Sequence, residues 1–368
     1  MAVISRSSVR TGSTSARRFL VGLHVWLGLL LGGVWALQGL TGAALVFHRE
    51  FDRPVEHVAQ GPMRPVGELL AAVQAGTGTK PSGLGVADVR GDVLSAAIKR
   101  QGEDWTVRLE AASGRIIDAR PAESGWRWLY KLHEELLLGD RGQTLIGLSG
   151  VLLLSAALTG LWAGWPRRAA WRAALQPSRW RTTRQRLFGW HRLTGLAATV
   201  ALALLSLTGM AMAFGKTLSP LLGRTPPKVA AVSGPPASAD AVLAAARARF
   251  PDARFVRITL PNEKNQSWQV RLRQPGEARA WSGVTSVRFD QTGRITQVYD
   301  PRSASFANQL YDAAFPLHNG ELLGLAGRIL VILAGLSLPA LWLTGLLAWL
   351  RKRRRVVVPA TPLQPSPA

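Results

Sequence analysis

The stretch LYKLHEELLLGDRGQTLIGL, which begins at Leu129, places His133 shortly before a long apolar run. The stretch FPLHNGELLGLAGRILVIL, which begins at Phe315, has the same frame around His318. In both stretches glycine stands at the sixth and ninth positions after the histidine, and a polar or basic residue stands at the tenth. The match predicts that the chain contains an internal repeat and that the two histidines belong to it.

The basic residues of the chain cluster beside its apolar runs. The net charge is +23 although 47% of the residues are apolar. Arginines gather near the N-terminus, between Pro166 and Trp190 where no acidic residue stands, and in the segment from Arg351 to Arg355. This distribution is typical of the cytoplasmic loops of a membrane protein. It predicts a lipid bilayer rather than a nucleic acid as the partner.

Four segments are long and apolar enough to cross a bilayer, which requires about 20 residues. The predicted spans are 19–47, 142–165, 193–214 and 323–350. The basic clusters place the segments 1–18, 166–192 and 351–368 in the cytoplasm, and with them both termini. The segments 48–141 and 215–322 then lie on the outer side of the membrane.

The two outer segments have the same sequence pattern. Each begins with a helical stretch, VGELLAAVQAG from Val66 or ADAVLAAARARF from Ala239, and continues with strand-like stretches. The strands are VLSAAIKR, DWTVRLEAA and GRIIDARP in the first segment, and RFVRITL, SWQVRLRQ, TSVRFD and GRITQVYDP in the second. We therefore expect two small α+β lobes.

The repeat also includes the spans. His24 and His191 share a frame of surrounding arginine and glycine residues, and a Thr-Gly pair recurs in every span. The pairs Thr159-Gly160 and Thr344-Gly345 stand at the same offset as His133 and His318. Such small residues allow close approach between membrane helices. The sequence thus predicts a four-helix transmembrane bundle that arose by tandem duplication, with two outer lobes.

Four of the six histidines occupy repeat-equivalent positions. We expect His24 to face His191 near the cytoplasmic side and His133 to face His318 near the outer side. The fifth, His48, has no counterpart in the repeat and could serve as an alternative outer ligand or as a hydrogen-bond partner of a ligand. The sixth, His57, is expected to be a solvated loop residue.

The composition of the chain limits which metal or cofactor the histidine pairs could bind. The chain has no cysteine, which excludes thiolate metal sites and cysteine-attached haem. Two imidazoles from different helices suit the axial positions of a b-type haem. Zinc requires three or four ligands, and no carboxylate recurs beside the histidines. A proton relay, or histidines that merely anchor helices at the interface, remain alternatives.

The stretches GLHVWLGLLLG, TGAALVFHREFD, LYKLHEELLLGDRG, WHRLTGL and PLHNGELLGLAGR, in this order, resemble the PepSY-associated transmembrane family of bacterial inner-membrane proteins. The resemblance extends from about Arg17 to Arg355, and the outer lobes resemble PepSY domains more loosely. It implies periplasmic lobes and a link to iron uptake. Members that are ferrisiderophore reductases hold b-type haem in the bundle and reduce ferric siderophores in the periplasm.

The resulting hypothesis is an inner-membrane protein that binds two b-type haems through His24, His191, His133 and His318. It would reduce a ferric siderophore or another ferric chelate with electrons from a donor that the sequence does not identify. The alternative is a membrane-anchored protein whose PepSY-like lobes bind peptides or regulate a protease, without redox activity.

Overall fold

A computed structural model describes residues 11–51, 58–88, 90–123, 125–224, 234–263, 265–279 and 282–354. The chain forms two compact units. The membrane unit consists of Met1–Ala44, Leu145–Met210 and Ile329–Ala368, and the sheet unit consists of Leu45–Thr144 and Ala211–Arg328. Each unit therefore contains segments from both halves of the sequence.

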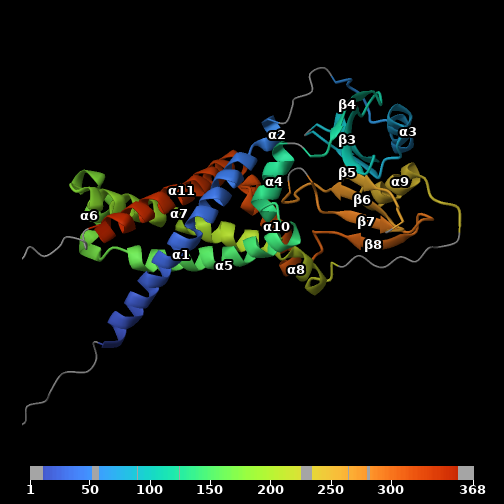
Figure 1. Cartoon of the computed structure of the whole chain (residues 1–368). Helices are drawn as coiled ribbons and strands as arrows, with labels where there is room; N and C mark the ends of the chain where they lie inside the picture. The colour runs from blue at the N-terminus through green and yellow to red at the C-terminus, as the bar shows by residue number, and fades with distance from the viewer. Residues whose placement is uncertain are drawn as a thin grey trace, which may run out of the picture. The chain divides into compact units, whose positions relative to one another are not determined.

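The membrane unit is built from four long helices, which Figure 1 shows. They are α1 (Thr11–Leu45), α5 (Asp140–Gly164), α7 (Thr183–Ala213) and α11 (Gly324–Arg354). Each is long and apolar enough to span a membrane. Many of their leucines, among them Leu30, Leu148 and Leu333, are exposed in the isolated chain. Exposed apolar side chains on a helix of this length are typical of a lipid-facing surface.

Small residues determine where these helices approach one another. A Cβ atom at Gly39 of α1 would lie 2.3 Å from the carbonyl oxygen of Gly335 of α11, so only glycine permits this contact. The bundle core between α7 and α11 contains Ala198, Leu202 and Ala334. Close backbone approach through small residues is the usual way in which membrane helices pack.

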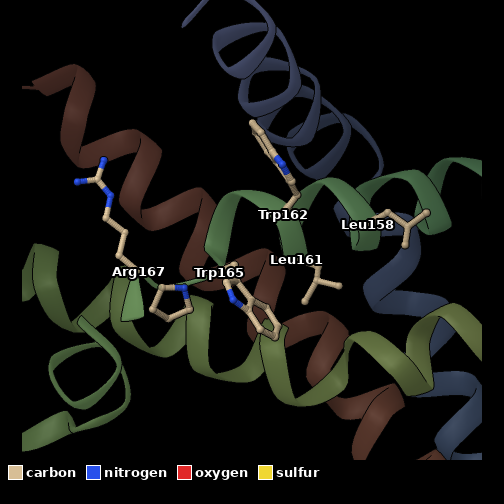
Figure 2. A pocket seen from close by; sticks show the side chains of 6 residues that line it. Leu158, Leu161, Trp162, Trp165 and Arg167 are labelled. Atoms are coloured by element: carbon tan, nitrogen blue, oxygen red, sulfur yellow. The ribbon is translucent and has the colours of Figure 1, made fainter. Parts of the chain in front are cut away.

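Tryptophans gather at the C-terminal end of α5 and in the loop that follows it. Leu158, Leu161, Trp162, Trp165, Pro166 and Arg167 line an open groove of about 490 Å³ (Figure 2). The Trp165 ring makes an edge contact with Trp171 of α6 (Trp171–Leu175), with ring centroids 5.2 Å apart. Two short 3₁₀ helices, η1 (Arg168–Ala170) and η2 (Pro177–Arg179), flank α6. Exposed tryptophans beside arginines are typical of a membrane–water interface.

The sheet unit contains one antiparallel sheet of eight strands in the order β4-β3-β2-β1-β5-β6-β7-β8. The first half of the chain supplies β1 (Gly83–Val86), β2 (Val93–Arg100), β3 (Glu103–Glu110) and β4 (Ile116–Pro121). The second half supplies β5 (Arg254–Thr259), β6 (Trp268–Arg273), β7 (Ser286–Phe289) and β8 (Ile295–Tyr299). The strands expected from the sequence are all present.

The sheet joins the two segments that were expected to form α+β lobes. Strand β1 pairs with β5, with Leu84 opposite Ile258, so the two predicted lobes are halves of one sheet. The sequence analysis did not recognise β1, because GLGV is short and rich in glycine, which is a weak strand former. Yet β1 is the strand that joins the halves. The order of strands in one half is the mirror image of the order in the other.

Helices of both halves cover one face of the sheet. They are α3 (Val66–Thr77) and α9 (Ala239–Arg249), whose side chains Leu69, Val73 and Leu243 are buried in the common core. Asp240 of α9 accepts hydrogen bonds from the backbone N–H groups of Val66 and Gly67 at the N-terminus of α3. A carboxylate at that end is favoured by the helix dipole, so the two halves are joined by charge as well as by pairing.

Two further helices stand apart from α3 and α9 in Figure 1 and precede the membrane helices in sequence. They are α4 (Gly125–Glu135) and α10 (Phe306–His318). The sequence analysis treated these residues only as the approach to a span, whereas each forms a separate helix that ends before α5 or α11 begins. The remaining short helices are α2 (His48–Phe51), α8 (Gly215–Leu221) and η3 (Glu321–Leu323).

Candidate functional sites at two histidine pairs

The membrane unit brings His24 of α1 and His191 of α7 together. Their ring centroids lie 6.0 Å apart, and the rings are inclined at 79°. Both side chains are half-buried. Repeat-equivalent positions on two different helices therefore meet, as the sequence predicts.

Both histidines of this inner pair are oriented by a backbone carbonyl group of another helix. The Nδ1 atom of His24 lies 2.9 Å from the oxygen of Ala156 in α5. The Nδ1 atom of His191 lies 3.1 Å from the oxygen of Leu341 in α11. A carbonyl oxygen only accepts, so Nδ1 carries the hydrogen and Nε2 of the neutral ring keeps its lone pair. Metal-ligating histidines have this arrangement.

A glycine makes room for each ring of the inner pair. A Cβ atom at Gly160 would lie 2.8 Å from Cε1 of His24, and one at Gly345 would lie 3.3 Å from Cε1 of His191. These glycines follow the accepting residues by one helical turn. We expected the Thr-Gly pairs at these positions to permit helix–helix approach. The structure shows that the glycines of α5 and α11 instead lie against imidazole rings.

The sheet unit brings His133 and His318 together in the same way. His133 stands in the last turn of α4 and His318 is the last residue of α10, with ring centroids 6.3 Å apart and an inclination of 55°. Both side chains are half-buried. This outer pair therefore has nearly the same separation as the inner pair, although it lies on short helices rather than on the spans.

The glycines of the opening motif form the turn that follows each outer histidine. A Cβ atom at Gly142 would lie 1.7 Å from the oxygen of Glu135, and one at Gly327 would lie 2.3 Å from the oxygen of Gly320. Both contacts join the second and ninth positions after the histidine. Gly139 and Gly324, at the sixth position, have positive φ angles of 62° and 60°, which favour glycine. The shared frame thus encodes a shared turn.

In the first half this turn places leucines in an unusual conformation. Leu136 and Leu137 have φ angles of 50° and 62°, where a side chain with a Cβ atom costs on the order of 1 kcal/mol or more per residue. The second half has Glu321 and Leu322 at these positions within η3, after Gly320 with a φ of 80°. The backbone next to His133 is therefore the more strained of the two.

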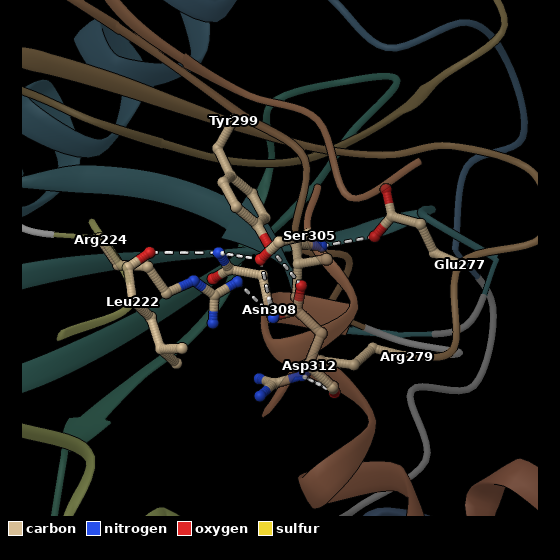
Figure 3. Close-up of polar contacts among 9 residues, drawn as sticks. Leu222, Arg224, Glu277, Arg279, Tyr299, Ser305, Asn308 and Asp312 are labelled. Atoms are coloured by element: carbon tan, nitrogen blue, oxygen red, sulfur yellow. Dashed lines mark hydrogen bonds and ion pairs between the residues drawn. The ribbon is translucent and has the colours of Figure 1, made fainter. Parts of the chain in front are cut away.

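A buried polar cluster holds α10 against the sheet (Figure 3). Asp312 of α10 is only 5% exposed and accepts hydrogen bonds from Arg224 and from the hydroxyl of Tyr299, each at 2.5 Å. Burial, together with the hydrogen bond to Asp312, raises the pKa of Tyr299, so its hydroxyl remains a donor. The Arg224 guanidinium also lies 4.5 Å from the centroid of the Tyr299 ring. These contacts fix the helix that carries His318.

The fifth histidine lies beside a tryptophan. Nδ1 of His48 is 2.6 Å from the oxygen of Leu45, and its ring centroid is 6.1 Å from that of Trp126 in α4. In the second half the repeat-equivalent residues are Gly215 and Tyr311, and the Tyr311 hydroxyl would lie 2.7 Å from a Cβ atom at Gly215. His48 thus fills the space that the Tyr311 hydroxyl fills in the other half. The sixth, His57, lies outside the described residues.

The basic residue of the opening motif, Arg328, stabilises the end of α1. It donates hydrogen bonds of 2.5 Å to Glu50 and to the backbone oxygen of Val46, and its guanidinium lies 3.9 Å from the Phe47 ring centroid. The hydrogen bond from Arg328 is the main reason why the pKa of Glu50 is lowered. Because the last carbonyl groups of a helix have no partner within it, a cation there is favourable.

The donor set of both pairs fits a haem. Within the described part of the chain, no group of three or more histidine, aspartate or glutamate side chains could hold a metal ion, so each pair offers two imidazoles. The rings of the inner and outer pairs lie 6.0 and 6.3 Å apart, so the two imidazoles of each pair could hold one haem between them. Zinc would require further ligands.

Comparison with protein families confirms the resemblance drawn from the motifs. The family model described as the PepSY-associated TM region matches residues 21–352, which is nearly the whole chain. No curated protein matches the chain. The matched residues include the four histidines of the two pairs and also His48.

Proposed function

Because the chain belongs to the PepSY-associated transmembrane family, we propose that it is a haem-binding electron-transfer protein of the bacterial inner membrane. Its substrate would be a ferric siderophore or another ferric chelate in the periplasm. The matching order of elements in the two halves of the chain supports this proposal, because a duplicated bundle with paired lobes is the fold expected for this role. The electron donor is unassigned.

The observation that carries the proposal is the matched environment of the inner histidines. His24 and His191 each direct Nδ1 to a carbonyl oxygen one turn before a glycine, so the lone pair of Nε2 would be available to a metal ion. A polar side chain within a membrane span costs free energy, and such residues usually serve a function. His133 and His318 would hold a second haem in the same manner.

A bound haem would supply one-electron transfer, and the residues of the chain would hold it and tune it. Reduction of Fe(III) to Fe(II) weakens the binding of iron to hard oxygen ligands, which promotes release from a siderophore. The helices α4 and α10 carry the outer histidines outside the spans. A water-soluble chelate could therefore reach them without entering lipid.

The visible absorption spectrum of the purified protein tests this proposal. Haem held by two histidines gives a Soret band and sharp α and β bands of the b type that appear on reduction with dithionite. We expect these bands, and we expect them to reoxidise when a ferric siderophore is added. A protein that is colourless when produced with ample haem would contradict the proposal. It would favour a membrane-anchored peptide-binding or protease-regulating protein instead.

The proposed orientation places both termini and the basic loop in the cytoplasm, because arginines concentrate there. A reporter enzyme that is active only in the periplasm should be inactive when fused after Arg355 and active when inserted at Gly234. The opposite pattern would reject the orientation and, with it, reduction on the periplasmic side.

A further inference from the structure

The second half of the sheet carries arginines on the face opposite the core. In β6 the residues Trp268, Val270 and Leu272 are buried, so the alternating residues Arg271 and Arg273 point to the other side. The same alternation places Arg257 of β5 and Arg288 of β7 on this second face, next to the buried Ile258 and Phe289. Three neighbouring strands thus present arginines on one surface.

The strand register brings these arginines close together. Arg257 is directly opposite Arg271 across β5 and β6, and Arg254 is opposite Arg273. Arg288 lies diagonal to Arg271, because it stands two residues beyond Ser286, the partner of Arg271. Burial and then the charges of Arg279, Arg257 and Arg288 lower the pKa of Arg271. Like charges directly opposite each other destabilise a sheet.

In the first half of the sheet, the arginine that corresponds to Arg288 has an acidic partner. There Arg108 of β3 faces Asp118 of β4 and forms an ion pair with it. The corresponding residue of the second half is Arg288, which faces the neutral Gln297 at the same position before a register shift. The acid of the first half is thus replaced by a residue that cannot neutralise an arginine.

The nearby acid, Glu277, interacts electrostatically with Arg271 and opposes the lowering of its pKa, but its carboxylate oxygens bind other groups. Glu277 accepts hydrogen bonds from the backbone N–H of Gln274 and Val284 and from the Thr285 hydroxyl. In the part of the chain that the structure describes, Arg257, Arg271 and Arg288 have no ion pair. A cluster of arginines that forms no ion pair is stabilised when an anionic ligand binds it.

Arg279 connects this surface to the outer histidine pair. Its carbonyl oxygen accepts a hydrogen bond of 3.2 Å from Arg273, and its Nε donates to the backbone oxygen of Asp312 in α10 at 3.4 Å. Its guanidinium lies 5.3 Å from the centroid of the Phe315 ring. Phe315 precedes His318 by three residues, which is about one helical turn.

We propose that Arg257, Arg271 and Arg288, together with Arg279, form a binding site for carboxylate groups beside His133 and His318. Guanidinium groups bind carboxylates with strong, often bidentate hydrogen bonds. The carboxylates could belong to an anionic ferric chelate of the citrate type or to the propionates of a haem. That the ligand is the iron substrate rests on the proposed function, whereas carboxylate binding itself does not.

Binding of gallium(III) citrate tests this site without any redox chemistry. Gallium(III) resembles iron(III) but is not reduced, so binding to the full-length protein in detergent can be measured by calorimetry whether or not haem is present. We expect Arg271→Gln and Arg257→Gln each to weaken binding about tenfold, the effect of losing one charge-assisted interaction. Raising the salt concentration should also weaken it. A gallium complex of a cationic hydroxamate should bind poorly.

Two controls separate the possible outcomes. Arg247→Gln removes the same charge from α9, on the opposite side of the sheet, and should leave binding unchanged. Arg257 is exposed, so its replacement tests the site even if Arg271→Gln reduces stability.

Unchanged gallium citrate affinity with loss of the outer haem in both arginine variants would identify haem propionates as the ligand. Unchanged affinity and unchanged haem content would overturn the proposal. Gallium binding to a colourless protein would refute the proposed function alone.

Discussion

In the membrane unit, His24 and His191 each donate a hydrogen bond to a carbonyl group of a neighbouring span, and a glycine lies against each ring. In the sheet unit, His133 and His318 stand at the ends of short helices that polar contacts and tight turns hold in place. The two pairs have similar ring separations of 6.0 and 6.3 Å. The same spacing is therefore reached by two different kinds of support.

The two kinds of support predict which substitutions should affect which histidine pair. The inner pair depends on the packing of apolar helices, and the contacts of its two histidines are similar in both halves of the chain. The outer pair is asymmetric, because Asp312 of α10 accepts two buried hydrogen bonds while the corresponding residue of α4 is Arg127. His48 and Trp126 add to the asymmetry. Substitutions that exploit these differences can test the account.

The largest expected effect separates the outer pair from His48. Replacing His318 with alanine removes one of the two proposed axial ligands, so we expect loss of one haem per chain. The variant His48→Ala should keep both haems, because the His48 ring lies beside Trp126 and is not one of the proposed ligands. Haem content per chain, measured as the pyridine haemochrome, decides between them. If His48→Ala loses a haem and His318→Ala keeps it, the outer haem must be assigned to His48 and His133 instead.

A smaller effect should follow from disrupting the buried cluster of α10. Asp312→Asn leaves the mostly buried Arg224 without its counter-charge, which we expect to cost about 3 kcal/mol of unfolding free energy. Tyr299→Phe removes one hydrogen bond and should cost about 1 kcal/mol. Chemical denaturation followed by tryptophan fluorescence measures both changes. Lys216→Gln, which breaks an exposed ion pair with Asp140, is the matched control and should change stability by less than about 1 kcal/mol.

The glycines of the inner pair provide a third comparison. Alanine normally stabilises a helix relative to glycine by about 1 kcal/mol, yet at Gly160 its Cβ would lie 2.8 Å from the His24 ring. We expect Gly160→Ala to shift the spectrum and lower the occupancy of the inner haem. Gly345→Ala should do so less, because its contact is 3.3 Å. Gly22→Ala, which meets nothing within 4 Å, is the control. Equal behaviour of all three variants would refute the role of these glycines.

The smallest effect concerns pH and the ion pair of Arg328. The pKa of Glu50 is lowered from 4.5, chiefly by the hydrogen bond from Arg328. Its folded-state pKa lies below its unfolded value, so its stabilisation is fully present above about pH 4.5 and is lost as the pH falls through the folded pKa. Melting temperatures at pH 6 and pH 3.5 should therefore differ slightly more in the wild type than in Glu50→Gln. An identical difference in both proteins would show that the pair does not contribute.

The sequence was sufficient to predict features that depend on local patterns. Periodicity identified every strand except β1, and the ends of β2 at Val93 and Arg100 agree with the expected stretch. The shared frame in the sequence predicted which histidines would meet, because matching positions on matching helices were expected to come to one level. Family membership also followed from the order of the motifs.

Features that depend on contacts between distant segments were not predictable in this way. The pairing of Leu84 with Ile258 joins two halves far apart in sequence, and no local pattern encodes it. The carbonyl groups of Ala156 and Leu341 are backbone atoms, so their role leaves no side-chain signal. The arginine surface could have been suspected from the alternation in WQVRLRQ and SVRF. Its missing counter-charge became evident only from the strand register.

The number of haems per chain, measured in variants that lack one complete histidine pair, tests the proposed haem assignment. The wild type should bind two haems. The variants His24→Ala/His191→Ala and His133→Ala/His318→Ala should bind one haem each, with reduced spectra that add up to the spectrum of the wild type. One haem or none in the wild type, or two haems in either double variant, would contradict the assignment of one haem to each histidine pair.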